Sequence, residues 1–245
     1  MRFAAAFLAV FSAYAQNASK PPSFDAATIK LVKGPITHSA DPVIKGRTMI
    51  SIASTLRDLI DYAYGVRSDQ LLGEPGWGKT DHYDLEAKSE GDGPLTTAQA
   101  QEMLRALLAE RFQLRTHRET QETQIYALVV DKGGAKFQAA APDATGGYHV
   151  TGGDKGMHME AKRNTMDQLA QQLSHSAGRP VLNRTGMDGR YVFTLDWWPG
   201  LTPPAELNVP DVFTAVKEQL GLKLESATAP IEKLVIDHAE KPSEN

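Results

Sequence analysis

Cysteine is absent from this 245-residue sequence. The chain therefore has no disulfides, no thiolate nucleophile and no cysteine-bound zinc. A chain of this length can bury an adequate hydrophobic core, so it would not need disulfides even outside the cytoplasm.

A surplus of positive charge is also missing. Lysine and arginine number 26 against 30 aspartate and glutamate residues, which gives a formal net charge of −4. Nucleic-acid-binding proteins usually carry a basic face, and attraction to anionic lipid requires a cluster of basic residues. The charge balance therefore predicts a protein that does not bind nucleic acid.

Long hydrophobic runs are absent apart from one short run at the N-terminus. Met1-Arg2 is followed by an uncharged stretch over 3–13, and Ala13 and Ala15 are small residues at the positions that a signal peptidase reads. This layout predicts a signal peptide over 1–15. The run is shorter than the roughly 20 residues of a membrane-spanning helix. We therefore expect an extracytoplasmic protein, periplasmic or secreted, that does not span the membrane once cleaved. The alternative, an N-terminal helix of a cytosolic protein, would need complete burial.

Hydrophobic periodicity predicts an α+β fold. Helices are expected after caps at Ser54, Thr96, Asn164 and Asp211, each followed by an apolar stripe. Alternating residues over 83–87 and 191–197 predict half-buried strands. The continuous apolar runs over 128–130 and 234–236 suit more buried strands.

These elements recur in the same order along the chain. Thr55-Leu56 matches Thr165-Met166, and Tyr83 matches Tyr191, at similar separations. We interpret the chain as two tandem repeats of a strand-helix-strand-helix-hairpin unit in a pseudo-twofold relation. The predicted division is a first α+β repeat over 24–138, a linker over 139–147 and a second repeat over 148–245. The alternative is that two α+β halves resemble each other by chance.

One segment matches a phosphate-binding motif in its letters. Gly73 to Thr80 reads G-x-x-x-x-G-K-T. A phosphate loop needs a helix that begins at the lysine, so that backbone amides surround the phosphates. The residues over 81–87 alternate like a strand instead. We therefore predict a turn with Trp77 packed against the core, and no bound nucleotide.

No catalytic or metal-binding constellation is visible elsewhere. The seven histidines are scattered, and the H-E-x-x-H and G-x-S-x-G signatures are absent. His158 and Glu160 would share one face of a strand, which we interpret as a solvated face. The sequence thus predicts no catalytic residue, no cofactor and no metal site. A hydrolase with an unrecognised carboxylate or histidine site stays open as the alternative.

Tryptophan offers the best candidates for binding. Trp197 continues the apolar alternation of 191–197 and is expected in the core. Trp198 falls on the opposite face beside the proline-rich loop over 199–210. Because exposed tryptophans often anchor ligands, Trp198 is predicted to bind. Trp77 is the second predicted binding residue, as a contributor to an aromatic surface.

Many segments together resemble an exported bacterial family of unknown function that is abundant in soil Acidobacteria. The resemblance covers about 24–245, and the residues that carry it include Leu59-Ile60, Ala63-Tyr64, Gly73-x-Pro75-x-Trp77, Tyr83-Asp84, 107–112, His117, 126–130, 178–181, Thr185-Gly186-x-x-Gly189-x-Tyr191, 218–224, 235–238 and 240–242. The sequence departs from the family pattern at Gly78-Lys79-Thr80 and at Asn183, where an aspartate is usual.

The resemblance implies export but supplies no reaction. Similar domains also occur fused behind BlaR-type membrane metallopeptidase domains, which implies an extracytoplasmic sensing or binding role. Together these observations favour a non-catalytic binding or sensing module for an envelope protein, peptide or glycan, rather than an enzyme.

Overall fold

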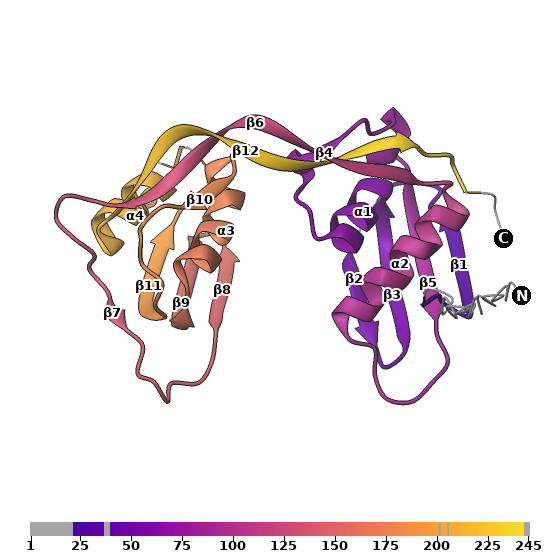
Figure 1. Ribbon diagram of the computed structural model, residues 1–245, viewed down its shortest axis with the longest axis horizontal. Coiled ribbons are helices and arrows are strands. Elements are labelled where there is room, and N and C mark those ends of the chain that lie inside the picture. Colours follow the sequence, from indigo (N-terminus) through magenta and orange to yellow (C-terminus); the bar gives the residue numbers. More distant parts are fainter. Residues whose placement is uncertain (1–21, 37–39, 201, 205, 243–245) are drawn as a thin grey trace, which may run out of the picture. The chain divides into compact units, whose positions relative to one another are not determined.

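The computed structural model describes residues 22–36, 40–200, 202–204 and 206–242. The predicted signal peptide lies outside these residues. The described chain is a mixed α/β protein with four α-helices and three sheets (Figure 1). Within it, no helix is both long and apolar enough to cross a membrane.

The chain forms two compact units. Unit 1 comprises the chain up to His117 together with the segment from Leu234 onward, and unit 2 comprises Arg118–Lys233. These bounds differ from the division at 139–147 predicted from the sequence, because each unit includes strand residues from the other half of the chain.

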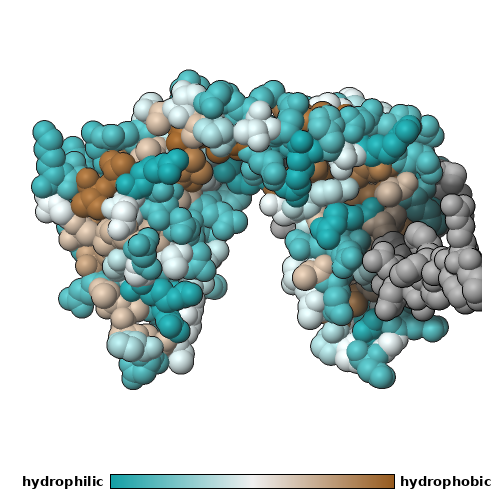
Figure 2. Space-filling view, in the orientation of Figure 1, coloured by the Kyte–Doolittle hydropathy of each residue, from teal (hydrophilic) through white to brown (hydrophobic). Residues whose placement is uncertain are grey.

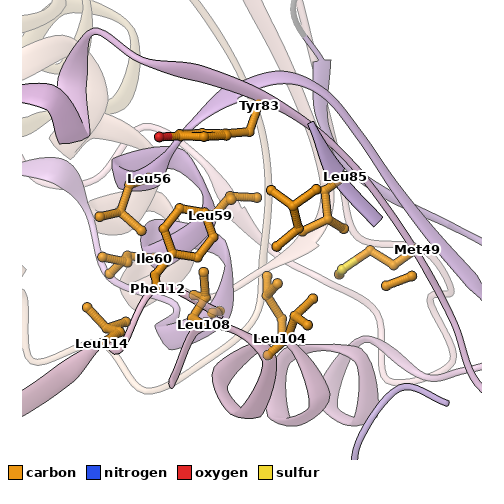
Figure 3. Close-up of a cluster of buried hydrophobic side chains, with 14 of the residues drawn as sticks. Met49, Leu56, Leu59, Ile60, Tyr83, Leu85, Leu104, Leu108, Phe112 and Leu114 are labelled. Carbon is orange, nitrogen blue, oxygen red and sulfur yellow. The ribbon is translucent and has the colours of Figure 1, made fainter. Parts of the chain in front are cut away.

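Unit 1 packs two helices against one face of an antiparallel sheet (Figure 1). The sheet has the order β1-β5-β3-β2. The elements are β1 (Ala26–Leu31), β2 (Ala40–Lys45), β3 (Thr48–Thr55), α1 (Leu56–Tyr64), the short strand β4 (Leu71–Leu72), β5 (His82–Lys88) and α2 (Thr97–Arg111). Figure 3 shows the core between them, where the ring of Phe112 lies among leucines of α1 and α2. Tyr83 packs edge-on against Phe112, with ring centroids 5.4 Å apart.

Unit 2 has a second antiparallel sheet, with the order β7-β11-β9-β8. Its elements are β7 (Gln138–Ala139), β8 (Tyr148–Gly153), β9 (Gly156–Asn164), α3 (Met166–Ala177), β10 (Val181–Asn183), β11 (Tyr191–Trp197) and α4 (Val212–Leu220). Buried residues of β9 and β11 pack with α3 and α4 in one core, so the opposite face of this sheet is open. The alternation predicted for 191–197 is confirmed, since Phe193, Leu195 and Trp197 are buried.

Two long strands, β6 (Arg115–Val130) and β12 (Leu222–His238), contribute to both units. They belong to the third sheet, which has the order β10-β6-β12-β4. In unit 1, β4 runs parallel to β12, with Leu71 opposite Leu234. In unit 2, β10 runs parallel to β6, with Val181 opposite Tyr126. The hairpin that closes the predicted first repeat, with the run over 128–130 as its last strand, is wrong, because β6 is one continuous strand whose polar middle contains no turn residue.

The helix starts follow the predicted capping chemistry closely. Thr96 and Asp211 cap α2 and α4 as predicted. The caps predicted at Ser54 and Asn164 are wrong by one residue, since Thr55 and Thr165 accept the capping hydrogen bonds of α1 and α3. Each of these threonines forms a reciprocal pair with the residue three positions later.

Candidate functional site

A cleft of about 620 Å³ lies at the end of the β8–β9 hairpin in unit 2. Residues of the hairpin, of β11 and of the proline-rich loop line it. The lining residues are Thr151, Gly152, Gly153, Asp154, Lys155, Gly156, Met157, His158, Asp196, Asn208 and Val209.

A glycine allows the hairpin to approach the proline-rich loop. Gly156 follows the two-residue turn Asp154-Lys155 and has φ 104°, a conformation that residues with a side chain rarely adopt. A Cβ atom at Gly156 would lie 2.8 Å from the carbonyl oxygen of Trp197 and 3.2 Å from a methyl group of Val209. The absence of a side chain at Gly156 therefore lets the β8–β9 hairpin pack closely against Val209 of the proline-rich loop.

His158 and Asp196 form the central polar pair of the cleft. They are cross-strand partners on β9 and β11, and His158 Nδ1 lies 2.6 Å from Asp196 Oδ1. Both side chains are about half exposed, at 51% and 58%. If Nδ1 donates to the carboxylate, Nε2 of the imidazole can accept a hydrogen bond from a ligand.

Thr151 lies opposite His158 on the other neighbouring strand, β8. Directly opposed residues on adjacent strands point to the same face of a sheet. Thr151, His158 and Asp196 therefore present a hydroxyl, an imidazole and a carboxylate in one row across the open face. The sequence predicted that His158 and Glu160 share a solvated face, and the structure confirms it, with Glu160 3.7 Å from Lys162.

A second cleft of about 490 Å³ adjoins the first. Its lining residues are Pro203, Pro204, Leu207, Asn208, Val209, Pro210, Glu218 and Gln219. Asn208 and Val209 line both clefts and lie between them. Gln219 of the second cleft is hydrogen-bonded to Asp196 of the first: its side-chain oxygen accepts from the backbone nitrogen of Asp196 at 2.9 Å, and its side-chain nitrogen donates to the carbonyl oxygen of Asp196 at 2.8 Å.

The two tryptophans after β11 have different surroundings. Trp197 is buried as predicted, and its Nε1 donates to Ser176 Oγ at 2.8 Å. Trp198 is half-buried at the base of the proline-rich loop, where its backbone nitrogen donates to the carbonyl oxygen of Pro210 at 2.8 Å. Trp198 lines neither cleft.

Comparison with family models gives a match over residues 57–239 to the family described as protein of unknown function DUF3738. The chain belongs to this family. The DUF3738 match runs from α1 to β12 and so includes the cleft residues. No curated protein and no solved structure matches the chain.

Trp77, the other predicted binding residue, also falls within the DUF3738 match but lies in unit 1. Its ring stacks on Phe112 with centroids 6.4 Å apart, and Lys241 Nζ lies 5.9 Å from the indole centroid. Trp77 is half-buried against the core, as the sequence predicted. Trp77 and Trp198 therefore have separate settings, and whether either binds a ligand stays a prediction.

The phosphate-loop resemblance within the DUF3738 match has a packing explanation. Residues 76–79 form one turn of 3₁₀ helix, and strand β5 follows, so no α-helix begins at Lys79. Lys79 instead lies 3.6 Å from Glu74, whose side chain is 4% exposed. Arg57 of α1 also binds Glu74, with its Nε 2.9 Å from Oε2. Lys79 and Arg57 therefore both lie close enough to the buried Glu74 carboxylate to neutralise its charge.

Asp61 lies near this ion pair and has an altered acidity. Burial raises the pKa of Asp61 to about 6, and the hydrogen bond from Ser68 opposes that shift. Oδ1 of Asp61 and Oε1 of Glu74 are buried without hydrogen-bond partners.

Among the described residues, no group of three or more histidine, aspartate or glutamate side chains is arranged to hold a metal ion.

Proposed function

We propose that this DUF3738 protein is an extracytoplasmic binding or sensing module, and that the cleft of unit 2 binds an envelope protein, peptide or glycan. The observation that carries the proposal is the exposed His158–Asp196 pair among the residues that line the cleft. Carboxylate, imidazole and the amide of Asn208 offer directional donors and acceptors to a polar ligand. The view in Figure 2 shows a mostly hydrophilic surface with small hydrophobic patches, which suits polar recognition.

The openness of the cleft favours binding over catalysis. A catalytic site usually excludes water, because charged groups act more strongly where the local dielectric constant is low. His158 and Asp196 are half exposed, and most of the residues that line the cleft belong to the β8–β9 hairpin. Such groups suit the rim of a recognition surface.

The signal peptide predicted over 1–15 supports a role outside the cytoplasm. The proposal predicts cleavage after Ala15, so that the protein recovered from the periplasm or medium begins at Gln16. N-terminal sequencing of that protein tests this point, and a cytoplasmic protein that retains Met1 would contradict it. The resemblance to domains fused behind membrane metallopeptidases further supports sensing at the envelope.

The binding proposal is tested by capture from envelope extract with two matched variants. The cleft variant carries His158→Ala and Asp196→Ala. The control carries Glu160→Ala and Lys162→Ala, an ion pair on the same open face but outside the cleft. We expect one stoichiometric ligand on the wild type and the control but not on the cleft variant. Equal capture by all three proteins would exclude the cleft as the binding site.

A hydrolase is the second candidate, and the row of Thr151, His158 and Asp196 favours it. His158 would take the proton of the threonine hydroxyl as the oxygen attacks an acyl carbon, and would pass that proton to the leaving group as its bond to the acyl carbon breaks. Water, deprotonated by the same imidazole, would then hydrolyse the acyl-threonine ester, which releases the acid and returns the proton to the threonine hydroxyl. A fluorophosphonate probe tests this candidate. Labelling that is lost in Thr151→Ala and retained in Thr194→Ala would support it, whereas an unlabelled wild type would count against it.

We also infer that the two halves derive from an internal duplication. In support, the sheet orders β1-β5-β3-β2 and β7-β11-β9-β8 correspond strand by strand when β1 is matched to β7, β2 to β8, β3 to β9 and β5 to β11. A helix also follows the matched strands, α1 after β3 and α3 after β9. An experimental structure whose halves superpose in this order would support the inference, and halves of unlike topology would contradict it.

A further inference from the structure

Strand β8 is the outermost strand of its sheet, after the order β7-β11-β9-β8. It pairs with β9 without a register shift, from Tyr148 opposite Ala161 to Gly153 opposite Gly156. Its other side has no neighbouring strand in the described part of the chain. A free edge of this kind leaves backbone donors and acceptors unpaired.

One hydrogen bond identifies which backbone groups face outward. The amide of Lys162 donates to the carbonyl oxygen of Gly147 at 2.9 Å, just before β8 begins. In an antiparallel ladder, hydrogen-bonded pairs alternate with non-bonded pairs. Alternate residues of β8 therefore bond to β9 from His149 onward, and Tyr148, Val150 and Gly152 direct their N–H and C=O groups to the free edge.

The features that usually protect an edge strand are absent from β8. The sequence of β8 is YHVTGG, with no proline, no lysine and no bulge. Strand β2 provides the contrast, because it contains Pro42 and its register shifts between Ala40 and Val43. Both β2 and β8 are edge strands, but only β8 is regular enough to accept another strand along its length.

The side chains of β8 indicate what an added strand would meet. Val150 packs against the core of unit 2, and the hydroxyl of Tyr148 accepts from Gln172 of α3 at 2.7 Å. On the other face, Thr151 leads into the cleft that contains His158. An added strand would therefore place apolar side chains beside α3 and polar side chains on the open face.

We propose that β8 binds an extended peptide of a partner protein by strand addition, so that the peptide forms a fifth strand and ends in the cleft. This inference rests on the proposed binding function and specifies peptide as the ligand class. Backbone hydrogen bonds to residues 148, 150 and 152 give the affinity, and the cleft gives the selectivity.

The test is selection of a displayed library of random twelve-residue peptides on the protein over 16–245, followed by affinity measurement with three proteins. Val150→Pro removes an outward N–H that β9 does not use, whereas Val150→Thr keeps that N–H and a β-branched side chain. We expect enriched peptides with alternating apolar and polar residues. We expect their affinity to fall at least tenfold in Val150→Pro and less than threefold in Val150→Thr, with both variants retaining the wild-type circular dichroism spectrum.

A second measurement does not depend on any variant folding. N-methylation of alternate peptide residues should weaken binding at least tenfold in one register and little in the other, because only one set of amides faces β8. No enriched peptide, equal binding by Val150→Pro, or equal effects of both methylation registers would overturn the inference. A dimer that light scattering detects in wild type and that Val150→Pro abolishes would also overturn it, since a second copy would then occupy the edge.

The two proposals fail separately. Envelope capture that depends on His158 and Asp196 but is unchanged in Val150→Pro would leave the cleft as a binding site and exclude strand addition.

Discussion

Gly73 and Ile236 approach so closely that a Cβ atom at position 73 would lie 2.5 Å from the carbonyl oxygen of Ile236. Gly73 also has φ 72°, which favours glycine. A Cβ atom at Gly78 would lie 3.1 Å from Cγ of Glu74. The glycine spacing that resembles a phosphate loop therefore follows from the approach of β12 and from the burial of Glu74.

Gly73→Ala should lower the free energy of unfolding by at least about 2 kcal/mol, because it combines a strained φ with a clash against backbone. Gly76→Ala is the matched control, since nothing lies within 4 Å of its added Cβ. The control should change stability by no more than about 0.5 kcal/mol. Urea unfolding of the two variants measures both effects, and similar losses would contradict the account.

Arg57→Ala should be more damaging than Lys79→Ala. Both cations contact Glu74, whose side chain is 4% exposed, but Arg57 is 28% exposed and Lys79 is 55% exposed. Removing Arg57 leaves a buried carboxylate poorly compensated, at a cost of about 2 kcal/mol. Removing the exposed Lys79 should cost less than about 1 kcal/mol. Urea unfolding of the two variants measures both costs, and equal costs would contradict this ranking.

Mg²⁺-ATP should leave the melting temperature of the wild type unchanged, because Lys79 lies in a turn that does not form a phosphate loop. Stabilisation by Mg²⁺-ATP that is lost in Lys79→Ala would contradict this.

Asp61→Asn should stabilise the protein at neutral pH. The pKa of Asp61 is raised by burial to about 6 from an ordinary value of 3.8, so the folded state binds this proton more tightly than the unfolded state. Above pH 6 the carboxylate is ionised in both states, and its burial penalises the folded one. The penalty, at most about 3 kcal/mol, disappears as the pH falls from 6 to 4. The stability difference between Asp61→Asn and wild type should therefore be largest at pH 7 and shrink at pH 4. A difference that does not depend on pH would contradict the shift.

The segment over 118–233 should fold by itself, whereas the segment over 148–245 should not. The first contains all of unit 2. The second lacks the β6 residues of that core, which include Leu128, a fully buried residue, and the partly buried Tyr126, whose ring lies 5.0 Å from that of Phe213. Thermal unfolding followed by circular dichroism should be cooperative only for 118–233. Cooperative unfolding of 148–245 would show that the predicted repeat is itself an autonomous domain.

Local signals in the sequence identified most of the secondary structure. The apolar stripes and capping residues located all four described α-helices, because capping depends on residues three positions apart. The alternation over 191–197 located β11 for a similar local reason. The turn predicted at the phosphate-loop resemblance is confirmed, because the strand pattern over 81–87 conflicts with a helix that begins at Lys79.

Long-range pairing could not be read in the same way. The predicted repeat unit ended in a hairpin, but the residues over 115–130 form one long strand, β6, whose partners β10 and β12 come later in the chain. The pairing of His158 with Asp196 joins residues 38 positions apart and depends on the register of β9 and β11. The alternation does place Asp196 on the open face, but no local signal selects its partner. Trp198 was chosen for exposure, and contact with the proline-rich loop leaves it half-buried.

Hydrogen–deuterium exchange of the 16–245 protein, with and without the ligand captured from envelope extract, tests the central claim most directly. Unit 2 binding through the cleft predicts slower exchange over 148–158 and around Asn208 when the ligand is present. Protection confined to unit 1, with exchange over 148–158 unchanged, would contradict the account.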